Sequence, residues 1–315
     1  MKISIVTTLY RSAPFLSEFY SRITHSVHNL GIPYELIMVN DGSPDNSLDV
    51  ALSFQQQDPN VKVIDLSRNF GHHKAILTGL SVTRGDLVFL IDCDLEEDPE
   101  LLERFYSLWE EQKGSIDVFY GMQENRSGTL YKRIAGALFY KIFNYFSSVQ
   151  ISGSICTVRL MSRRYVDSLL EYKDKNVFLA ALFEMVGYKQ LPVTINKPYK
   201  GSSSYNLIRK IALMTEAITS FSSKPLSMIM LTGVTISSVS FLFALYLVFR
   251  KLLSSSIISG WTSLMVSVWF LGGVILFSLG VLGVYITKIY NETKDRPISI
   301  IKAIYYNEHR GAADE

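Results

Sequence analysis

The chain has 315 residues, of which 48% are hydrophobic, and its mean hydropathy of +0.18 is high for a water-soluble protein. The formal net charge of +2 is too small to indicate a nucleic-acid-binding protein, and no basic block interleaved with aromatic residues occurs. The two cysteines, Cys93 and Cys156, fit a reducing compartment and lack a metal-ligand spacing, so we expect two unpaired thiols.

Short apolar runs alternate with helical patterns through the N-terminal part of the chain. The runs at residues 2–8, 34–40, 61–66 and 87–91 predict strands. Ser12 and Pro14 signal a helix that reaches about residue 30, and Pro44 signals the next. This order predicts an α/β fold, a doubly wound and mostly parallel sheet with right-handed crossovers. Asp41 and Asp92, which follow two of the strands, then lie at the same edge of the sheet.

The fourth predicted strand runs into an acidic stretch that contains Asp92, Asp94 and Glu96. Ligands of open α/β sheets bind beyond the carboxyl ends of the strands. In an extended chain these three carboxylates would project to one side, which suits a hard divalent cation that carries a phosphate. The alternative is a solvated acidic turn that caps the helix starting near Pro99.

Two long apolar runs occur near the C-terminal end. Residues 226–249 and 252–287 contain no charged residue, and each run exceeds the roughly 20 residues that a membrane-spanning helix needs. A Ser/Gly-rich turn separates them, so we expect a hairpin of two spans, at about 226–249 and 262–286. The N-terminal apolar run is too short for a signal peptide, so residues 1 to about 200 are expected to stay in the cytoplasm.

Basic residues flank the predicted hairpin unevenly, which bears on its orientation. Seven lie on the outer sides of the two spans and two lie in the connection, a bias that supports both termini inside. The outer residues are Arg209, Lys210, Lys224, Lys288, Lys294, Arg296 and Lys302, and those in the connection are Arg250 and Lys251.

Two further segments, residues 130–146 and 205–223, mix aromatic and aliphatic residues with basic ones. Each is either a core helix or a helix that lies in the headgroup layer of a membrane. The second segment leads directly into the first predicted span, which favours the membrane-surface interpretation of both.

Four motifs in this order carry a family resemblance: Val39–Ser43 (VNDGS), Ser67–Gly71 (SRNFG), Asp92–Glu96 (DCDLE) and Arg159–Arg164 (RLMSRR). Followed by two apolar runs, they resemble the glycosyltransferase family 2 enzymes that act on polyprenyl phosphates, a group that includes dolichyl-phosphate mannose synthase and bactoprenol glucosyltransferases. The resemblance extends from Ile3 to about Pro297 and implies a GT-A-like catalytic domain.

The resemblance implies roles for individual residues. Asp41 would contact the nucleoside of a nucleotide-sugar donor, with Tyr10, Arg68 and Asp92 also in the donor site; the less favoured alternative for Tyr10 is a half-buried loop residue. Asp94 and Glu96 would hold Mg²⁺ or Mn²⁺. Glu96 stands where the family usually has Gln, and both side chains supply an oxygen ligand. The implied catalytic residues are Asp92, Asp94 and Arg133.

The acceptor phosphate would be held by basic and small residues outside the acidic stretch. The implied set is Arg126, Arg133, Lys200, Ser203, Arg209 and Lys210. The serine run around Ser203 could also be a plain flexible loop. His72 and His73 are either a solvated pair at a helix start or a contact to the donor diphosphate.

One position departs from the family. Thr157 stands where relatives commonly have Asp. If that acid were an obligatory general base, the chain would be impaired. However, a phosphate monoester has a second pKa of about 6 and is mostly dianionic at neutral pH, so we expect activity to survive.

The resemblance implies an inverting enzyme that moves one sugar from a nucleotide diphosphate sugar, UDP-linked in the leading hypothesis, to a polyprenyl phosphate for cell-surface glycans. It also implies a multi-pass protein of the bacterial inner membrane and a homo-oligomer, a tetramer by resemblance. The alternatives are a catalytically silent scaffold or part of a lipid-sugar translocation complex, which intact Asp41, Asp92 and Asp94 argue against. A processive polysaccharide synthase would need more spans and a Gln-x-x-Arg-Trp motif.

The expected domain organisation follows from these elements. The ranges are 1–204 for the catalytic domain, 205–224 for an interfacial helix, 225–290 for the hairpin and 291–315 for a cytoplasmic tail.

Overall fold

The computed structural model describes residues 1–112, 114–123, 141, 144–146, 155–175, 177–195, 219, 222–253 and 260–307. The chain forms two compact units. The first comprises Met1–Tyr140, Val149–Ser204 and Arg296–Glu315, and the second comprises Lys141–Ser148 and Tyr205–Asp295.

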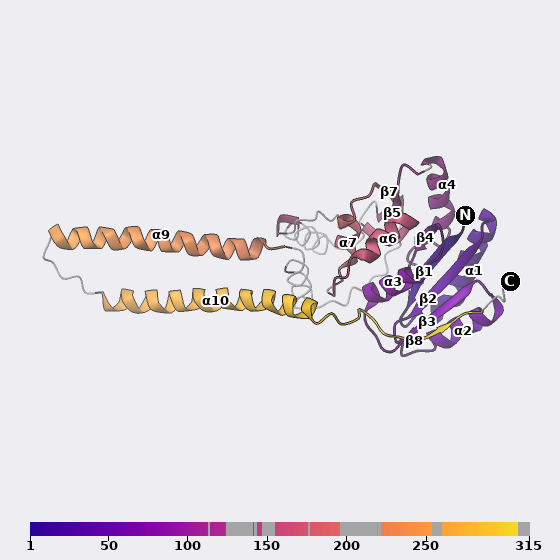
Figure 1. Ribbon diagram of the computed structural model, residues 1–315, viewed down its shortest axis with the longest axis horizontal. Coiled ribbons are helices and arrows are strands. Elements are labelled where there is room, and N and C mark those ends of the chain that lie inside the picture. Colours follow the sequence, from indigo (N-terminus) through magenta and orange to yellow (C-terminus); the bar gives the residue numbers. More distant parts are fainter. Residues whose placement is uncertain are drawn as a thin grey trace, which may run out of the picture. The chain divides into compact units, whose positions relative to one another are not determined.

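The first unit is built on an eight-stranded mixed sheet with the order β7-β5-β6-β4-β1-β2-β3-β8 (Figure 1). The strands are β1 Ile3–Leu9, β2 Tyr34–Asn40, β3 Val61–Leu66, β4 Leu87–Leu90, β5 Val118–Gln123, β6 Ile155–Ser162, β7 Gln190–Ile195 and β8 Ile301–Tyr305. Strands β1 to β4 are parallel, whereas β6 and β8 run antiparallel to their neighbours. The predicted α/β class and its mostly parallel sheet are confirmed.

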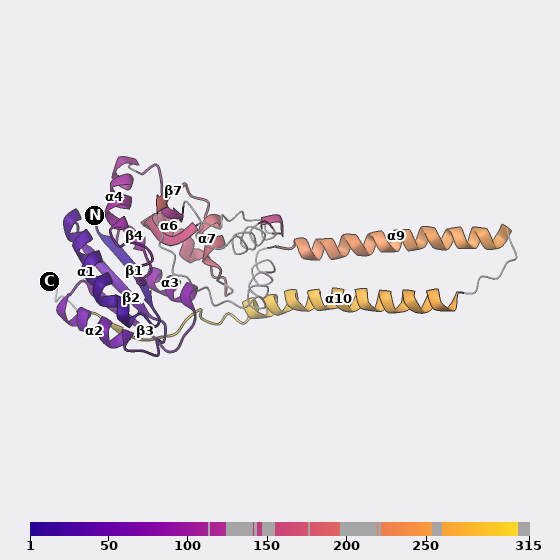
Figure 2. The same ribbon diagram turned by 180° about the vertical axis from the view of Figure 1, so that it is seen from behind.

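Helices cover both faces of this sheet (Figures 1 and 2). They are α1 Ala13–Leu30, α2 Ser47–Gln57, α3 His72–Ser81, α4 Leu101–Gln112, α6 Arg163–Glu171 and α7 Leu179–Met185. Helix α1 begins after Ser12 with Pro14 in its first turn, and it ends at Gly31, whose φ of 62° is left-handed. The helix start and stop signals in the sequence were therefore correct here.

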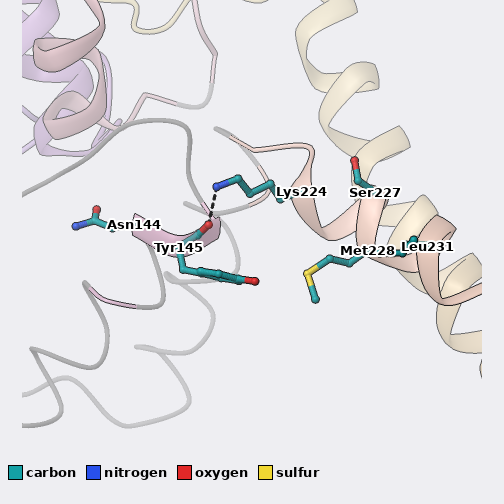
Figure 3. Close-up of a pocket in the computed structure, with 6 residues that line it drawn as sticks. All are labelled: Asn144, Tyr145, Lys224, Ser227, Met228 and Leu231. Carbon is teal, nitrogen blue, oxygen red and sulfur yellow. Dashed lines mark hydrogen bonds between the residues drawn. The ribbon is translucent and has the colours of Figure 1, made fainter.

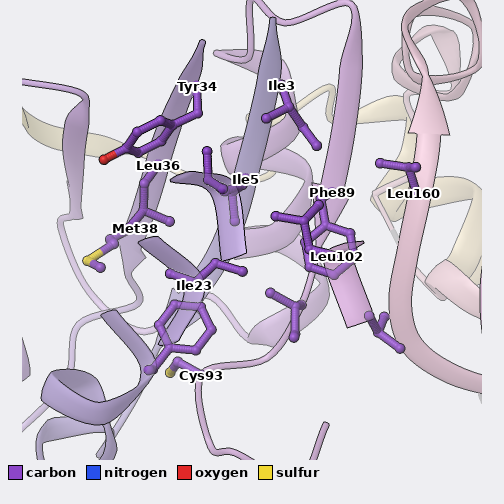
Figure 4. Close-up of a cluster of buried hydrophobic side chains, with 14 of the residues drawn as sticks. Ile3, Ile5, Ile23, Tyr34, Leu36, Met38, Phe89, Cys93, Leu102 and Leu160 are labelled. Carbon is purple, nitrogen blue, oxygen red and sulfur yellow. The ribbon is translucent and has the colours of Figure 1, made fainter. Parts of the chain in front are cut away.

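The alternation of side chains along β1 explains why both faces need helices. Ile3 and Ile5 pack with α1 and α4, together with Phe89 of β4 (Figure 4). Val6 points the other way and packs with residues of α3, α6 and α7. Because strand side chains alternate between faces, a strand that is apolar on both needs a helical layer on each side.

The last strand, β8, brings the C-terminal segment back into the sheet. It pairs antiparallel with β3, and the Ser67 amide donates to the Ile300 carbonyl at 2.9 Å. Thr78 Oγ1 lies 2.6 Å from Ser299 Oγ. The sequence indicated only a tail here, whereas the chain after the apolar helices completes the edge of the first unit.

The second unit contains the helices α9 Lys224–Leu253 and α10 Trp261–Thr293, which lie side by side (Figures 1 and 2). The segments Lys224–Phe243 and Ser267–Thr293 are long and apolar enough to cross a membrane. Their large apolar side chains are exposed, for example 80% for Trp269 and 71% for Leu276. Because a core helix of a soluble protein buries such residues, the pattern favours contact with lipid.

Candidate functional site

The loops that follow the parallel strands meet at the carboxyl edge of the sheet. Asp41, directly after β2, is only 2% exposed, and its two carboxylate oxygens accept hydrogen bonds from the amides of Phe70 and Gly71, at 2.7 and 3.0 Å. Burial raises the pKa of Asp41, and the two amides oppose that shift. Asp41 therefore joins the loop after β2 to the loop after β3. The direct nucleoside contact implied by the resemblance stays a prediction.

Gly42 explains why these two loops can touch. Its φ is 58°, and a Cβ atom there would lie 2.5 Å from the backbone of Arg68 and Asn69. Only glycine tolerates both the left-handed conformation and the close approach. The Asp-Gly and Arg-Asn-Phe-Gly motifs are 25 or so residues apart in sequence, and their backbones lie against each other at Gly42.

A second network, which the sequence analysis missed, joins the loop after β1 to the start of α2. The Asp45 carboxylate accepts hydrogen bonds from the Ser43 and Ser47 hydroxyls and from the Ala13 amide, while the Ser43 hydroxyl accepts from the Arg11 amide. Desolvation opposes ionisation of Asp45, but the serine hydroxyls outweigh it and lower its pKa to about 2. The Ser-Pro-Asp-Asn-Ser run was the available signal, since Asp and Ser form such local bonds in turns.

Two predicted donor-site residues lie exposed at this edge. Tyr10 is 47% exposed directly after β1, and the Arg11 guanidinium lies 5.7 Å from its ring centroid. Arg68 is exposed too, with its guanidinium 4.2 Å from the ring centroid of Phe70. An aromatic ring and a guanidinium that face solvent at a strand edge are suited to stack on a base and to pair with a phosphate.

The acidic stretch after β4 forms a turn. β4 ends at Leu90, and Leu95 has a left-handed φ of 58°. The Asp94 carboxylate accepts a hydrogen bond from the Glu96 amide at 2.9 Å, which closes this turn. The expectation of an extended chain from Asp92 to Glu96 is therefore wrong, because the local hydrogen bond and the left-handed residue bend the backbone after the strand.

The bend changes the kind of metal site that these residues can make. Among the residues that the structure describes, no three His, Cys, Asp or Glu side chains come together as a ready-made metal site. A Mg²⁺ ion bound with a nucleotide takes only one or two protein carboxylates, and phosphate oxygens and water complete its shell. Asp94 and Glu96, both half-buried in one turn, fit that smaller donor set.

Cys93, between the two aspartates, is a buried packing residue. Its thiol donates to the Thr8 carbonyl at 3.2 Å, and burial raises its pKa to about 11. Neither Cys93 nor Cys156 forms a disulfide, as expected. A thiol held protonated in this way is a poor nucleophile and a poor metal ligand.

The two histidines at the start of α3 differ in their surroundings. His72 has a side chain that is 45% exposed at the carboxyl edge, 3.5 Å from Asp92. His73 is half-buried, its Nδ1 lies 3.2 Å from the Val177 carbonyl oxygen, and burial lowers its pKa. The alternative of a solvated pair therefore fails for His73.

Thr157 lies at the same edge on β6. Strands β4 and β6 are antiparallel, and Leu90 pairs with Arg159. Two residues further along, Thr157 is therefore level with Asp92. The Thr157 amide donates to the buried Glu97 carboxylate at 3.2 Å. Arg159 is 2% exposed, and burial lowers its pKa to about 10. It donates to the carbonyls of Thr157 and Cys156, so its role is to hold the end of β6.

The arginine pair of the fourth motif lies at the other ends of the strands, after β6 and beside the start of β4. Arg163 donates to the Thr83 carbonyl at 3.0 Å, and Arg164 forms a two-point contact with Asp117 at 2.5 and 2.8 Å. These two arginines therefore stabilise the fold and are not part of the carboxyl-edge site.

The remaining predicted phosphate-binding residues lie outside the described part of the chain. They are Arg126, Arg133, Lys200, Ser203, Arg209 and Lys210.

The second unit has a pocket of about 410 Å³ beside the start of α9 (Figure 3). Lys224 donates from Nζ to the Tyr145 carbonyl at 2.7 Å, and its Nζ lies 5.8 Å from the Tyr145 ring centroid. Met228 and Leu231 supply apolar walls, and Asn144 and Ser227 complete the lining. One cation beside apolar walls suits an anionic group that carries a hydrocarbon chain.

The comparisons with known proteins agree with the fold and the motifs. Residues 4–170, more than half of the chain, match Glycosyl transferase family 2. The chain belongs to glycosyltransferase family 2, and it is a glycosyltransferase.

Its relatives match over nearly their whole lengths. A Mycobacterium tuberculosis (strain CDC 1551 / Oshkosh) protein named among the glycosyltransferases is 42% identical, over 97% of this chain and 89% of that protein. The glycosyltransferase YkcC of Bacillus subtilis (strain 168) is 35% identical, over 98% and 96%. The bactoprenol glucosyl transferase of Shigella phage SfX is 32% identical, over 96% and 99%.

Solved structures match only part of the chain. Mannosyl-3-phosphoglycerate synthase from Rubrobacter xylanophilus has a TM-score of 0.46 at 17% identity, over 70% of this chain and 72% of that chain. TarS of S. aureus in complex with UDP-GlcNAc has a TM-score of 0.43 at 19% identity, over 70% and 66%. Because both TM-scores are below 0.5, the fold is assigned from the strand order and direction in the sheet.

Proposed function

We propose that this glycosyltransferase transfers one sugar, with inversion, from a UDP-linked donor to a membrane polyprenyl phosphate. The observation that carries the proposal is the extent of the match to bactoprenol glucosyl transferases. It covers 96% of this chain and 99% of the phage SfX protein, and so includes the apolar helices as well as the family 2 unit. A soluble acceptor would not require two helices with exposed apolar surfaces.

Transfer with inversion needs one displacement. The acceptor phosphate oxygen attacks the anomeric carbon, a new carbon–oxygen bond forms, and the bond to the nucleoside diphosphate breaks with its electron pair on the leaving oxygen. A phosphate monoester is mostly dianionic above its second pKa of about 6, so no side chain has to remove a proton. Thr157 in place of an acid is compatible with this chemistry.

The residues at the carboxyl edge have separate tasks in this proposal. Asp92 faces the donor sugar and ribose. Tyr10 and Arg68 bind the nucleotide, and Asp41 keeps the loop of Arg68 in place. Asp94 and Glu96 would hold Mg²⁺ or Mn²⁺, and the ion would supply positive charge to the leaving diphosphate. Arg133, on the segment expected to lie at the membrane surface, binds phosphate.

For the acceptor, we place the phosphate near basic residues that precede the first apolar helix. Lys224, the first residue of α9, lines the pocket of Figure 3 and adds a described cation next to this group. Lys200, Ser203, Arg209, Lys210 and Arg126 are the other proposed contributors. An ammonium group at the end of an apolar helix lies at the depth of lipid headgroups, where a lipid phosphate must also lie.

We also infer that α9 and α10 cross the inner membrane as a hairpin, with the first unit in the cytoplasm. Chain connectivity supports an even number of crossings. The first unit contains segments before α9 and, from Arg296 onward, after α10, so the chain that leaves this unit returns to it. A homo-oligomer, a tetramer by resemblance, remains a prediction.

The test is direct. Membranes that contain the protein are incubated with a panel of nucleotide sugars and polyprenyl phosphate, and lipid products are identified by mass spectrometry. One donor should give a polyprenyl-phosphate monosaccharide, and Asp94→Asn membranes should give none. If the wild-type protein gives no lipid-linked sugar with any donor, the catalytically silent scaffold becomes the better interpretation.

A further inference from the structure

The His72 side chain contacts residues at the ends of two neighbouring strands. Its Nδ1 atom is 3.0 Å from the hydroxyl oxygen of Thr8, in β1, and its Nε2 atom is 3.5 Å from Oδ1 of Asp92, two residues beyond the end of β4. Both ring nitrogens therefore face a protein oxygen. A histidine that is only solvated at a helix start has no reason to place both nitrogens in this way.

The register of the sheet explains why these residues meet. β1 and β4 are parallel neighbours in which Val6 pairs with Leu90, and the Ile91 amide donates to the Val6 carbonyl at 3.1 Å. Thr8 and Asp92 are therefore level with each other, two residues beyond that pair. The third element is α3, which begins at His72.

The backbone before His72 is held independently of the imidazole ring. The Gly71 amide donates to Asp41, and the Gly71 carbonyl accepts from the Lys74 and Ala75 amides at 3.0 and 3.1 Å. Gly71 has a φ of 100°, a conformation that other residues rarely adopt. The position of the ring is thus fixed by the sheet, by the loop after β3 and by the start of α3.

Hydrogen-bond chemistry indicates which atoms donate and which accept among Thr8, His72 and Asp92. An ionised carboxylate only accepts, so the contact is favourable when the nitrogen that faces Asp92 carries the proton. In the neutral imidazole Nδ1 is then an acceptor, and it takes its bond from the Thr8 hydroxyl. In this arrangement Thr8 donates to His72, and the other nitrogen of His72 directs its proton towards Asp92.

We propose that His72 is a positioning residue for sugar transfer: oriented by Thr8, it fixes the carboxylate plane of Asp92 toward the donor. The inference rests on the function proposed above. The terminal torsion of an aspartate is broad and roughly two-fold, so its own backbone does not set the direction of its oxygens. A misplacement of about 1 Å at a reacting centre can cost on the order of a hundredfold in rate.

The first experiment needs no turnover. The full chain, labelled with ¹⁵N-histidine in detergent, is studied by NMR, and the His72 signals are assigned from the His72→Asn spectrum. We expect His72 as the Nε2–H tautomer, and we expect Thr8→Val to shift it toward a mixture, because Nδ1 loses its donor. An Nδ1–H tautomer in the wild-type protein, or signals unchanged in Thr8→Val, would overturn the proposal.

The second experiment separates positioning from folding. His72→Ala should lower kcat by about tenfold to a hundredfold with a smaller change in donor KM, the pattern expected when an interaction matters mainly in the transition state. His72→Gln should restore part of that loss, since its amide N–H can face Asp92. The matched control is His25→Gln, at an exposed histidine of α1, and it should behave as wild type.

The outcomes distinguish the two proposals. If the wild-type protein transfers sugar and His72→Ala matches the His25→Gln control, the positioning role is wrong and the proposed function stands. If the wild-type protein transfers no sugar, the proposed function fails, and the positioning role that depends on it falls as well. The tautomer measurement then decides whether the contact among the three residues exists.

Discussion

Lys302 and Asp65 form an ion pair between the last strand of the chain and β3, with 3.0 Å between Nζ and Oδ2. The Asp65 side chain is only 4% exposed, and its other oxygen accepts a hydrogen bond from the Asn40 side chain at 2.8 Å. Asn40 directly precedes Asp41. The segment that follows the apolar helices is therefore connected through one buried carboxylate to the end of β2, where the loop of Asp41 begins.

Removal of the lysine should loosen the C-terminal strand. Lys302→Met leaves the buried Asp65 carboxylate without its cation, and a buried charge that loses its partner destabilises the structure around it. We expect faster limited proteolysis at residues 296–307 and a lower Tm. Lys189→Met, at an exposed lysine just before β7, is the control. Equal cleavage rates in the two variants would show that the ion pair does not hold β8.

Substitution of Asp41 tests the contact between the loop after β2 and the loop after β3. In Asp41→Asn the amide NH₂ faces one of the two backbone N–H donors, so one buried charge-assisted hydrogen bond is lost, at a cost of about 1.5–3 kcal/mol. Donor binding should weaken more than the chemical step slows, because the loop of Arg68 shifts in both the ground state and the transition state. Donor Kd by calorimetry and hydrogen exchange at Phe70 and Gly71 measure this. A large fall in kcat at unchanged donor KM would contradict it.

The parallel strands β1 to β4 were predictable because their signals are local, whereas β5, β6 and β7 were not predicted. The apolar runs of β1 to β4 and the Pro and Gly residues at helix ends need no knowledge of the rest of the chain. β8 was not predictable, since its five residues pair with a strand more than two hundred residues earlier, and such long-range pairing leaves no local signal.

The candidate site likewise has features that the sequence predicts and features that it does not. The position of Asp41 and Asp92 at one edge followed from strand order. The bend at Leu95 did not, because a left-handed leucine carries no recognisable sequence signal. The tasks of Asp41 and His72 depend on contacts between loops, and these are set only when the strands come together.

Divalent cations should be essential for the reaction. Asp94→Asn removes one of few hard ligands, so it should abolish transfer and weaken Mn²⁺ binding measured by electron paramagnetic resonance in the presence of UDP. Asp98→Asn is the matched control, because Asp98 is close in sequence but pairs with Arg22 of α1 at 3.1 Å. Full turnover of the wild-type protein in EDTA would refute the metal requirement.

His73 predicts how stability depends on pH. Burial depresses its pKa in the folded protein below the ordinary value of 6.5. The unfolded chain therefore binds a proton first, and this contribution to stability is present above pH 6.5 and is lost as the pH falls through the folded pKa. The Tm of the wild-type protein should fall more between pH 7.5 and about 5.5 than that of His73→Gln. Parallel Tm curves for the two proteins would show that His73 does not contribute.

The acceptor site is tested by a comparison of two media. Arg209 and Lys210 precede the first apolar helix in the sequence, and the proposed function assigns them to the acceptor phosphate, whereas Lys224 lines the pocket of Figure 3. A dianion held by these cations should bind less well without them. The double variant Arg209→Ala/Lys210→Ala, and separately Lys224→Met, should raise the apparent KM for polyprenyl phosphate in neutral detergent micelles while donor Kd stays unchanged. If the residues only anchor the chain to anionic headgroups, acceptor KM in neutral micelles will equal that of the wild type, and activity will fall only in anionic bilayers.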